Sequence, residues 1–128
     1  MGILNSMFRN EAKNTHNNIN WIPLTSIDQL KKIREQSKLE TVFLFKHSTR
    51  CGISSIVLKR FEKLFDEDII NVKVYYLDLL NYRNVSNEVA NIFQVIHQSP
   101  QLLIVRNQSV VLNVSHYDIT TVNIKKYL

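Results

Sequence analysis

The sequence contains a single cysteine, Cys51, and this scarcity excludes several classes of protein. One thiol cannot form an internal disulfide, so a secreted disulfide scaffold is excluded and a reducing compartment, the cytoplasm, is expected. One cysteine and four scattered histidines offer no zinc-ligand spacing, so no metal site is expected. A Cys-x-x-Cys redox pair is absent because Ser54 occupies the second position, and the phosphatase pattern fails because Val57 stands where it needs arginine.

Long apolar runs and concentrated positive charge are also missing. No stretch approaches the roughly 18 apolar residues that span a membrane, so no membrane association is expected. The 16 Lys and Arg residues against 11 Asp and Glu residues leave a net charge of +5, but the basic residues are dispersed along the chain. Nucleic-acid-binding modules usually show a denser basic stripe, so no nucleic-acid partner is expected. The length leaves room for one domain, which we place at 21–128 after a polar tail at 1–20.

The apolar patterns predict strands and helices in alternation. Pro23 confines the first strand to a sheet edge, and the Ser26 to Gln29 segment has the composition of a helix capping box. Asn107 and Gln108 form a predicted two-residue hairpin turn. The expected strands are 21–24, 41–45, 72–77, 101–106 and 109–114, and the expected helices are 27–36, 53–65, 85–93 (capped by Asn84 or Ser86) and 120–128.

This order of elements predicts the α/β class. We expect a mixed central sheet with parallel strands plus a C-terminal antiparallel hairpin, flanked by helices. The helix after residue 51 is expected to bury Ile53, Val57 and Phe61 on one face. In sheets of this kind the functional site lies at the C-terminal ends of the strands. Cys51 follows the strand 41–45 and precedes a helix, so it is expected at such an end.

Cys51 is therefore the candidate nucleophile. The N–H groups of the first helical turn and the positive end of the helix dipole favour a thiolate, and Arg50 and Lys46 add nearby cations. Ser54, three residues further on, either caps the helix or directs its hydroxyl toward the sulfur. The sequence leaves these two roles open.

Four further positions can approach the cysteine. His47 and His97 are expected in turns, where each can act as a base or remain simply solvated. Asp78 ends a predicted strand and is expected to form a turn, or to relay protons beneath the cysteine. Ser99-Pro100 precedes the hairpin, and a cis bond there would direct the backbone of Ser99 toward the cysteine turn; the sequence does not decide between cis and trans.

The segment from Lys46 to Ser54, Lys-His-Ser-Thr-Arg-Cys-Gly-Ile-Ser, resembles the active-site segment of the monothiol bacilliredoxins of the YtxJ type found in Firmicutes. More broadly, residues 21–128 resemble the thioredoxin-like fold, with Ser99-Pro100 standing before the hairpin. The family typically reads Thr-Cys-Pro-Ile-Ser around its cysteine. Here Arg50 replaces the threonine and Gly52 replaces the proline.

The resemblance implies a cytoplasmic monothiol thiol-disulfide oxidoreductase that removes bacillithiol from S-bacillithiolated client proteins through a Cys51–bacillithiol mixed disulfide. It implies bacillithiol as the thiol cosubstrate and no tightly bound cofactor. Bacillithiol carries malate carboxylates, which cations at positions 46, 50, 59 and 60 can attract. The alternative is a non-catalytic binding or redox-sensing module in which a small thiol caps Cys51. The residues expected to bind the substrate thiol are Arg50, Gly52, Ser54, Ser99, Pro100 and His47.

Overall fold

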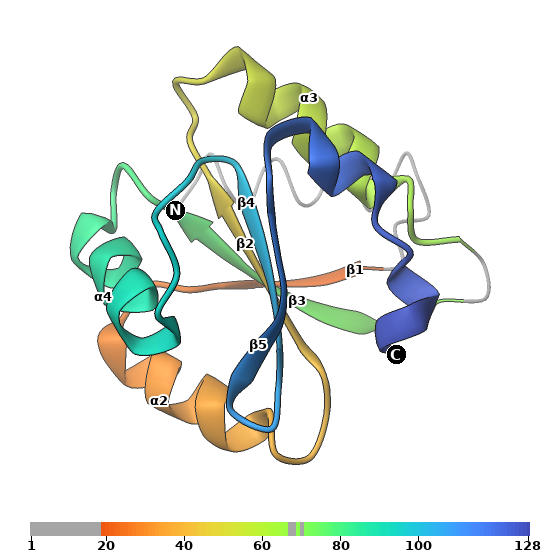
Figure 1. Cartoon of the computed structure of the whole chain (residues 1–128). Helices are drawn as coiled ribbons and strands as arrows, with labels where there is room; N and C mark the ends of the chain where they lie inside the picture. Colours follow the sequence, from red (N-terminus) through yellow and green to blue (C-terminus); the bar gives the residue numbers. More distant parts are fainter. Residues whose placement is uncertain (1–18, 67–68, 70) are drawn as a thin grey trace.

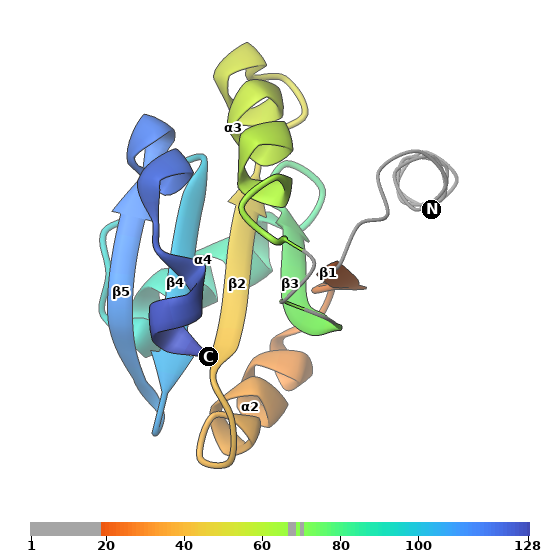
Figure 2. The ribbon, with the colours of Figure 1, turned by 90° about the vertical axis from the view of Figure 1, so that its right-hand side faces the viewer.

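The computed structural model describes residues 19–66, 69 and 71–128, which form one five-stranded sheet with helices on both faces (Figure 1). The expected polar tail lies outside the described residues except for Ile19 and Asn20, which begin the first strand. The strand order across the sheet is β1-β3-β2-β4-β5, and the sheet is strongly twisted (Figure 2).

The sheet is mixed, as the sequence predicts. Strands β1 and β2 run parallel to β3, whereas β4 runs antiparallel to both β2 and β5. Pro23 lies on the edge strand, as expected. The hairpin turn is also confirmed, because Asn107 (φ 51°) and Gln108 (φ 67°) both have the positive φ of a tight two-residue turn. The strands are β1 (Ile19–Pro23), β2 (Val42–His47), β3 (Val72–Asp78), β4 (Gln101–Arg106) and β5 (Ser109–Ser115).

Helix α2 (Ile27–Gln36) begins with the predicted capping box: Gln29 N donates to Ser26 Oγ, and Ser26 N donates to Gln29 Oε1. Helix α4 (Arg83–Phe93) starts earlier than predicted. Its N-cap is Tyr82 rather than Asn84 or Ser86, because Tyr82 N already closes a turn onto the Asp78 carbonyl at 3.0 Å. Ser86 therefore lies inside the helix rather than at its cap, and it is buried.

Helix α3 (Gly52–Glu62) ends sooner than predicted, and its first turn does not bury Ile53, which is 41% exposed. The predicted final helix is also replaced, by two short 3-10 helices, η1 (His116–Thr121) and η2 (Ile124–Tyr127). Two threonine hydroxyls in η1 donate to main-chain carbonyls three residues earlier, Thr120 to Tyr117 and Thr121 to Asp118. Such local bonds compete with the α-helical ladder, which accounts for the tighter geometry.

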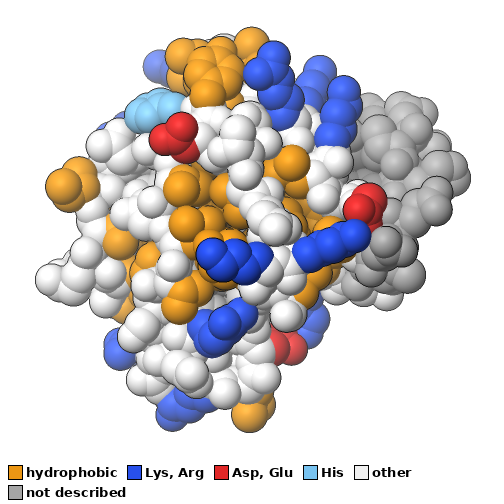
Figure 3. Space-filling view, turned by 45° about the vertical axis from the view of Figure 1, so that its right-hand side comes forward, with side chains coloured by type: hydrophobic (Ala, Val, Ile, Leu, Met, Phe, Trp, Pro, Cys, Tyr) orange, Lys and Arg blue, Asp and Glu red, His pale blue; other side chains and the backbone are white. Residues whose placement is uncertain are grey.

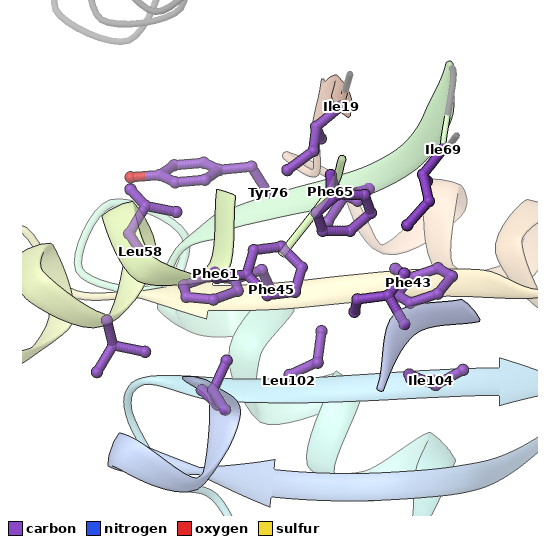
Figure 4. Close-up of a cluster of buried hydrophobic side chains, with 14 residues drawn as sticks. Ile19, Phe43, Phe45, Leu58, Phe61, Phe65, Ile69, Tyr76, Leu102 and Ile104 are labelled. Carbon is purple, nitrogen blue, oxygen red and sulfur yellow. The ribbon is translucent and has the colours of Figure 1, made fainter. Parts of the chain in front are cut away.

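Two apolar layers hold the sheet. Helices α2 and α4 cover one face, and α3 with the C-terminal 3-10 helices covers the other (Figure 1). All six residues of β2 are buried, so this central strand contributes alternately to both layers. Figure 4 shows the aromatic centre of the layer beneath α3, where Phe43 and Phe45 of β2 meet Phe61 of α3 and Phe65, which follows the end of that helix. The expected core residues Tyr75, Tyr76, Phe61 and Phe93 are all buried.

The C-terminal segments leave a shallow groove, lined by both polar and apolar side chains, on this second face. Figure 3 shows apolar side chains reaching the surface there, with lysine and arginine side chains around them. The groove lies between β5 and the 3-10 helices, and its lining includes Leu112, Val114, Val122, Lys126 and Tyr127. It lies away from the turn that carries the cysteine.

Candidate active site at the carboxyl end of β2

Cys51 is the N-cap residue of α3, directly after the turn that leaves β2. Its backbone is extended (φ −105°, ψ 117°), its N–H donates to the Ser48 carbonyl at 3.2 Å, and its carbonyl accepts from Ser55 N. The side chain makes no capping hydrogen bond and is partly exposed. No acidic residue lies in the first helical turn. The thiol therefore lies at the positive end of a three-turn helix, with no carboxylate beside it in that turn.

Ser54 holds the turn closed. Its side chain is fully buried, and its Oγ accepts a hydrogen bond from Ser48 N at 3.4 Å. The structure thus gives Ser54 a third role, beyond the two considered from the sequence: it ties the first turn of α3 to the end of β2. Arg50 and Gly52 lie on either side of Cys51, and both are exposed.

Ser99 and Pro100 lie at the same edge of the sheet. Lys46 of β2 pairs with Gln101 of β4, so the two residues before Gln101 continue alongside the end of β2. The Ser99-Pro100 bond is cis, and Pro100 is held by a 3.0 Å hydrogen bond from His116 N to its carbonyl. Figure 1 shows the segment from α4 into β4 and the turn from β2 into α3 at one end of the molecule.

Three buried polar atoms lack a hydrogen-bond partner among the described residues: His47 Nδ1, Asp78 Oδ1 and Ser99 Oγ. All three lie at this edge, because His47 and Asp78 end the neighbouring strands β2 and β3 and are paired in register. Buried polar atoms are nearly always satisfied, so a group of orphaned atoms marks where a polar ligand or water is accommodated. The other carboxylate oxygen of Asp78 accepts from Asn81 Nδ2 at 2.7 Å, which is the turn-forming role predicted for it.

His47 is not a turn residue as expected, but the last residue of β2, and it is 4% exposed. Its ring packs against Tyr76. Burial lowers the pKa of His47 to about 4, and the Asp78 carboxylate partly opposes the shift. The imidazole is therefore neutral at physiological pH, which suits a hydrogen-bonding group rather than a cation.

Lys46 does not provide a cation beside the sulfur, contrary to the sequence-based expectation. Alternation along β2 turns its side chain to the opposite face from Phe45 and the α3 layer, where it is fully buried. Its Nζ lies 3.1 Å from His97 Nδ1 and 3.4 Å from the Ser86 carbonyl oxygen. Burial lowers the pKa of Lys46 to about 8.

The site also presents apolar side chains that sequence reasoning assigned elsewhere or did not consider. Ile53 and Ile56 lie exposed on the first turns of α3, and Ile96 in the segment before Ser99 is 79% exposed. Ser86, which the sequence suggests only as a helix cap, is a further polar residue here, because its hydroxyl lies 3.4 Å from His97 Nδ1. Alternation along β2 is the sequence signal that could have found the contact between Lys46 and His97, because it places Lys46 on the same buried face as Val42 and Leu44.

Among the described residues no cluster of three metal-ligating side chains is found. Within the same part of the chain, no helix combines the length and apolarity that a membrane span requires.

Comparison with known proteins gives a match to one family model. The model described as "Monothiol bacilliredoxin BrxC" matches residues 22–124, which is most of the chain. The matched range includes Cys51, the Ser99-Pro100 bond and every described strand apart from the first three residues of β1.

Solved structures agree on the fold. A structure described as a putative oxidoreductase with a thioredoxin fold is 33% identical, with a TM-score of 0.71 over 84% of this chain and 92% of that one. Thioredoxin pre-protein from Schistosoma mansoni is 21% identical, with a TM-score of 0.65 over 85% of this chain and 99% of that one. Thioredoxin from Trypanosoma brucei brucei is 16% identical, with a TM-score of 0.66 over 88% of this chain and 92% of that one. The thioredoxin-like fold expected from the sequence is thus confirmed.

Proposed function

Because this thioredoxin-fold thiol oxidoreductase belongs to the monothiol bacilliredoxin family, we propose that it removes bacillithiol from S-bacillithiolated client proteins in the cytoplasm. The observation that carries the proposal is the single, partly exposed Cys51 at the start of α3. A chain with one cysteine must obtain its resolving thiol from outside, which is what a monothiol exchange enzyme requires.

The proposed reaction is two consecutive thiol-disulfide exchanges. The Cys51 thiolate attacks the bacillithiol sulfur of the client's mixed disulfide, and the client cysteine leaves as a thiolate that takes up a proton. A second bacillithiol, as thiolate, then attacks the bacillithiol sulfur now bound to Cys51. Bacillithiol disulfide is released and Cys51 returns to its thiolate, so no electrons are gained or lost by the enzyme over the cycle.

The edge of the sheet offers complementary binding groups. Among the described residues, Ser99 makes no backbone hydrogen bond to another main-chain group, so its N–H and C=O are available to an extended client segment. The exposed side chains of Ile53, Ile56 and Ile96 provide apolar contacts around it.

The malate carboxylates of bacillithiol require cations, and the exposed Arg50, Lys59 and Arg60 are the candidates. Arg50 precedes the thiol directly, whereas Arg60 lies over the Tyr117 ring at 5.8 Å. Lys46 is removed from the set considered from the sequence, because a fully buried ammonium cannot meet a carboxylate at the surface.

Intact-mass spectrometry tests the reaction directly. The reduced protein is mixed with a model client that carries bacillithiol on one cysteine, alongside the Cys51→Ser variant and a glutathione-modified client. We expect the bacillithiol adduct to move onto Cys51 with release of unmodified client, to fail with Cys51→Ser, and to be weaker with glutathione.

Absence of transfer despite an alkylatable Cys51 would refute the enzymatic proposal. It would instead favour the binding or sensing module, in which a small thiol caps Cys51 and no client is repaired.

A further inference from the structure

Lys46 is a buried cation without a counter-ion. It lies in the central strand, is fully buried, and forms no ion pair with any described carboxylate. Burying an ammonium is costly unless it is paired, and an apolar residue of similar size usually gives an equal or more stable core. A lysine here is therefore poorly explained by stability, and its contacts indicate what else it does.

One of its two contacts fastens the segment 95–100, which we call the client loop, and the other, to the Ser86 carbonyl oxygen, anchors Lys46 to α4. Lys46 Nζ donates to His97 Nδ1 at 3.1 Å, and the Ser86 hydroxyl lies 3.4 Å from the same ring nitrogen. An ammonium has no acceptor, so His97 Nδ1 must be the unprotonated nitrogen and Nε2 must carry the hydrogen. His97 thus reaches from the exposed loop down to β2 and α4.

A second buried side chain fastens the same loop. Gln101, paired with Lys46 across the β2–β4 ladder, is fully buried. Its Nε2 donates to the Ile96 carbonyl at 3.0 Å, and its Oε1 accepts from Gln98 N at 3.4 Å. Residues 96, 97 and 98 are therefore each held by a buried polar group, while the side chain of Ile96 itself remains exposed.

We propose that Lys46 and His97 form a latch that positions the client loop, so that Ile96 and the Ser99 backbone are presented to the polypeptide around the modified client cysteine. Lys46 and His97 are positioning residues and do not contact the reacting sulfur atoms. The inference rests on the proposed function and adds to it how the protein client, as distinct from bacillithiol, is held.

The latch requires a neutral His97. Protonation would direct an N–H toward the Lys46 ammonium at 3.1 Å and remove the acceptor. The groups that face His97 are Lys46 from β2 and Ser86 and Arg83 from α4. Burial and the two cations lower the pKa of His97 from its ordinary value, so the latch is closed at neutral pH and opens in acid.

Steady-state kinetics with a bacillithiolated protein client test the latch. For Lys46→Met and His97→Phe we expect KM for the client to rise about tenfold, the factor corresponding to one lost hydrogen bond to a charged group, with kcat and Cys51 alkylation unchanged. His97→Asn keeps an acceptor near the Nδ1 position and should retain a KM close to wild type. Lys31→Met, on the exposed side of α2, is the matched control for charge loss.

The pH profile separates positioning from a general structural effect. Because the pKa of His97 lies below the ordinary histidine value of 6.5, wild-type KM should rise only as the pH falls below that value and His97 is protonated, whereas His97→Asn should be insensitive over the same range. The exposed His116→Asn variant controls for another histidine and should follow the wild type.

Amide hydrogen exchange of the client loop and the NMR tautomer of His97 test the latch independently of activity. Faster exchange at residues 95–100 in His97→Phe, with an Nε2–H imidazole in the wild type, supports it. Unchanged exchange and unchanged client KM would overturn it, even with normal transfer activity. If the wild type transfers no bacillithiol, the proposed function fails and the exchange and NMR results alone decide on the latch.

Discussion

Replacing Lys46 with methionine is expected to stabilise the fold at neutral pH, although the residue lies at the centre of the sheet. Burial lowers the pKa of Lys46 from 10.5 to about 8. That difference of about 2.5 units, at 1.36 kcal/mol per unit, corresponds to about 3 kcal/mol spent on keeping the ammonium buried. Methionine has a similar length and no charge, and losing the bonds to His97 and Ser86 offsets part of the gain, at about 1 kcal/mol each. We therefore expect a net stabilisation of about 1 kcal/mol.

The pH dependence of this effect has a defined sign. The pKa of Lys46 is lower in the folded than in the unfolded chain, so between about pH 8 and pH 10 the unfolded chain binds more protons. The free energy of unfolding of the wild type should therefore rise with pH across that window. Lys46→Met removes the group, and its curve should lack this rise. Measurements stop at about pH 10 because tyrosines with raised pKa values, Tyr75 and Tyr76, contribute an opposite slope above it.

Urea unfolding of the wild type, Lys46→Met and Lys31→Met at several pH values provides the assay. The surface variant should change the free energy of unfolding by less than about 0.5 kcal/mol. A Lys46→Met protein destabilised by more than about 1 kcal/mol at pH 7, or a wild-type curve that is flat between pH 8 and 10, would refute the reasoning. A variant that is more stable yet binds clients more weakly would identify a residue kept for function at the expense of stability.

Two further predictions concern the turn that carries the cysteine. His47 has a pKa of about 4 in the fold against 6.5 in the free side chain, so lowering the pH from 6.5 to 4 should reduce the free energy of unfolding by about 3 kcal/mol. In acid unfolding curves, the free energy of unfolding of His47→Phe should fall less over that range. Gly52 is the first residue of α3, a Cβ there would meet nothing within 4 Å, and the backbone of Cys51 before it is already extended. Gly52→Pro should therefore raise the free energy of unfolding by about 0.5 to 1 kcal/mol. A variant that is less stable than the wild type in thermal denaturation would show that the Gly52 backbone does not have the conformation that proline needs.

The sheet was predictable because its strands carry strong local signals. The apolar strand around Phe43, the proline at position 23 and the Asn107-Gln108 turn each indicate their own structure, and the mixed topology follows from their order. The C-terminal helix was not, since side-chain bonds of Thr120 and Thr121 compete with the helical ladder only once the segment is folded. The apolar spacing of this segment does not record where those hydroxyl groups point, so it could not distinguish a 3-10 helix from an α-helix.

In the candidate site, too, some features follow from the sequence and others depend on the folded structure. Cys51 at a strand-to-helix turn follows from sequence alone, and the structure has it there. The contact between Lys46 and His97 joins residues 51 positions apart, and the cis bond depends on packing around Pro100, so neither leaves a sequence signal of its own. The proximity of Lys46 to Cys51 in the sequence favours a contact with the thiol, whereas strand alternation turns the lysine side chain to the other face of the sheet.

The position of β2 at the centre of the sheet has a consequence for the order of assembly. Phe43 pairs with Val74 on one side and Ile104 on the other, so both neighbours of this strand are synthesised after it. The local β4–β5 hairpin can form quickly, but β2 is enclosed only after chain segments of about 30 and about 60 residues have closed onto it. During synthesis the strand that leads to the thiol therefore keeps one edge unpaired until β4 has been made, so its apolar side chains stay open to wrong pairing for longer than those of the β4–β5 hairpin.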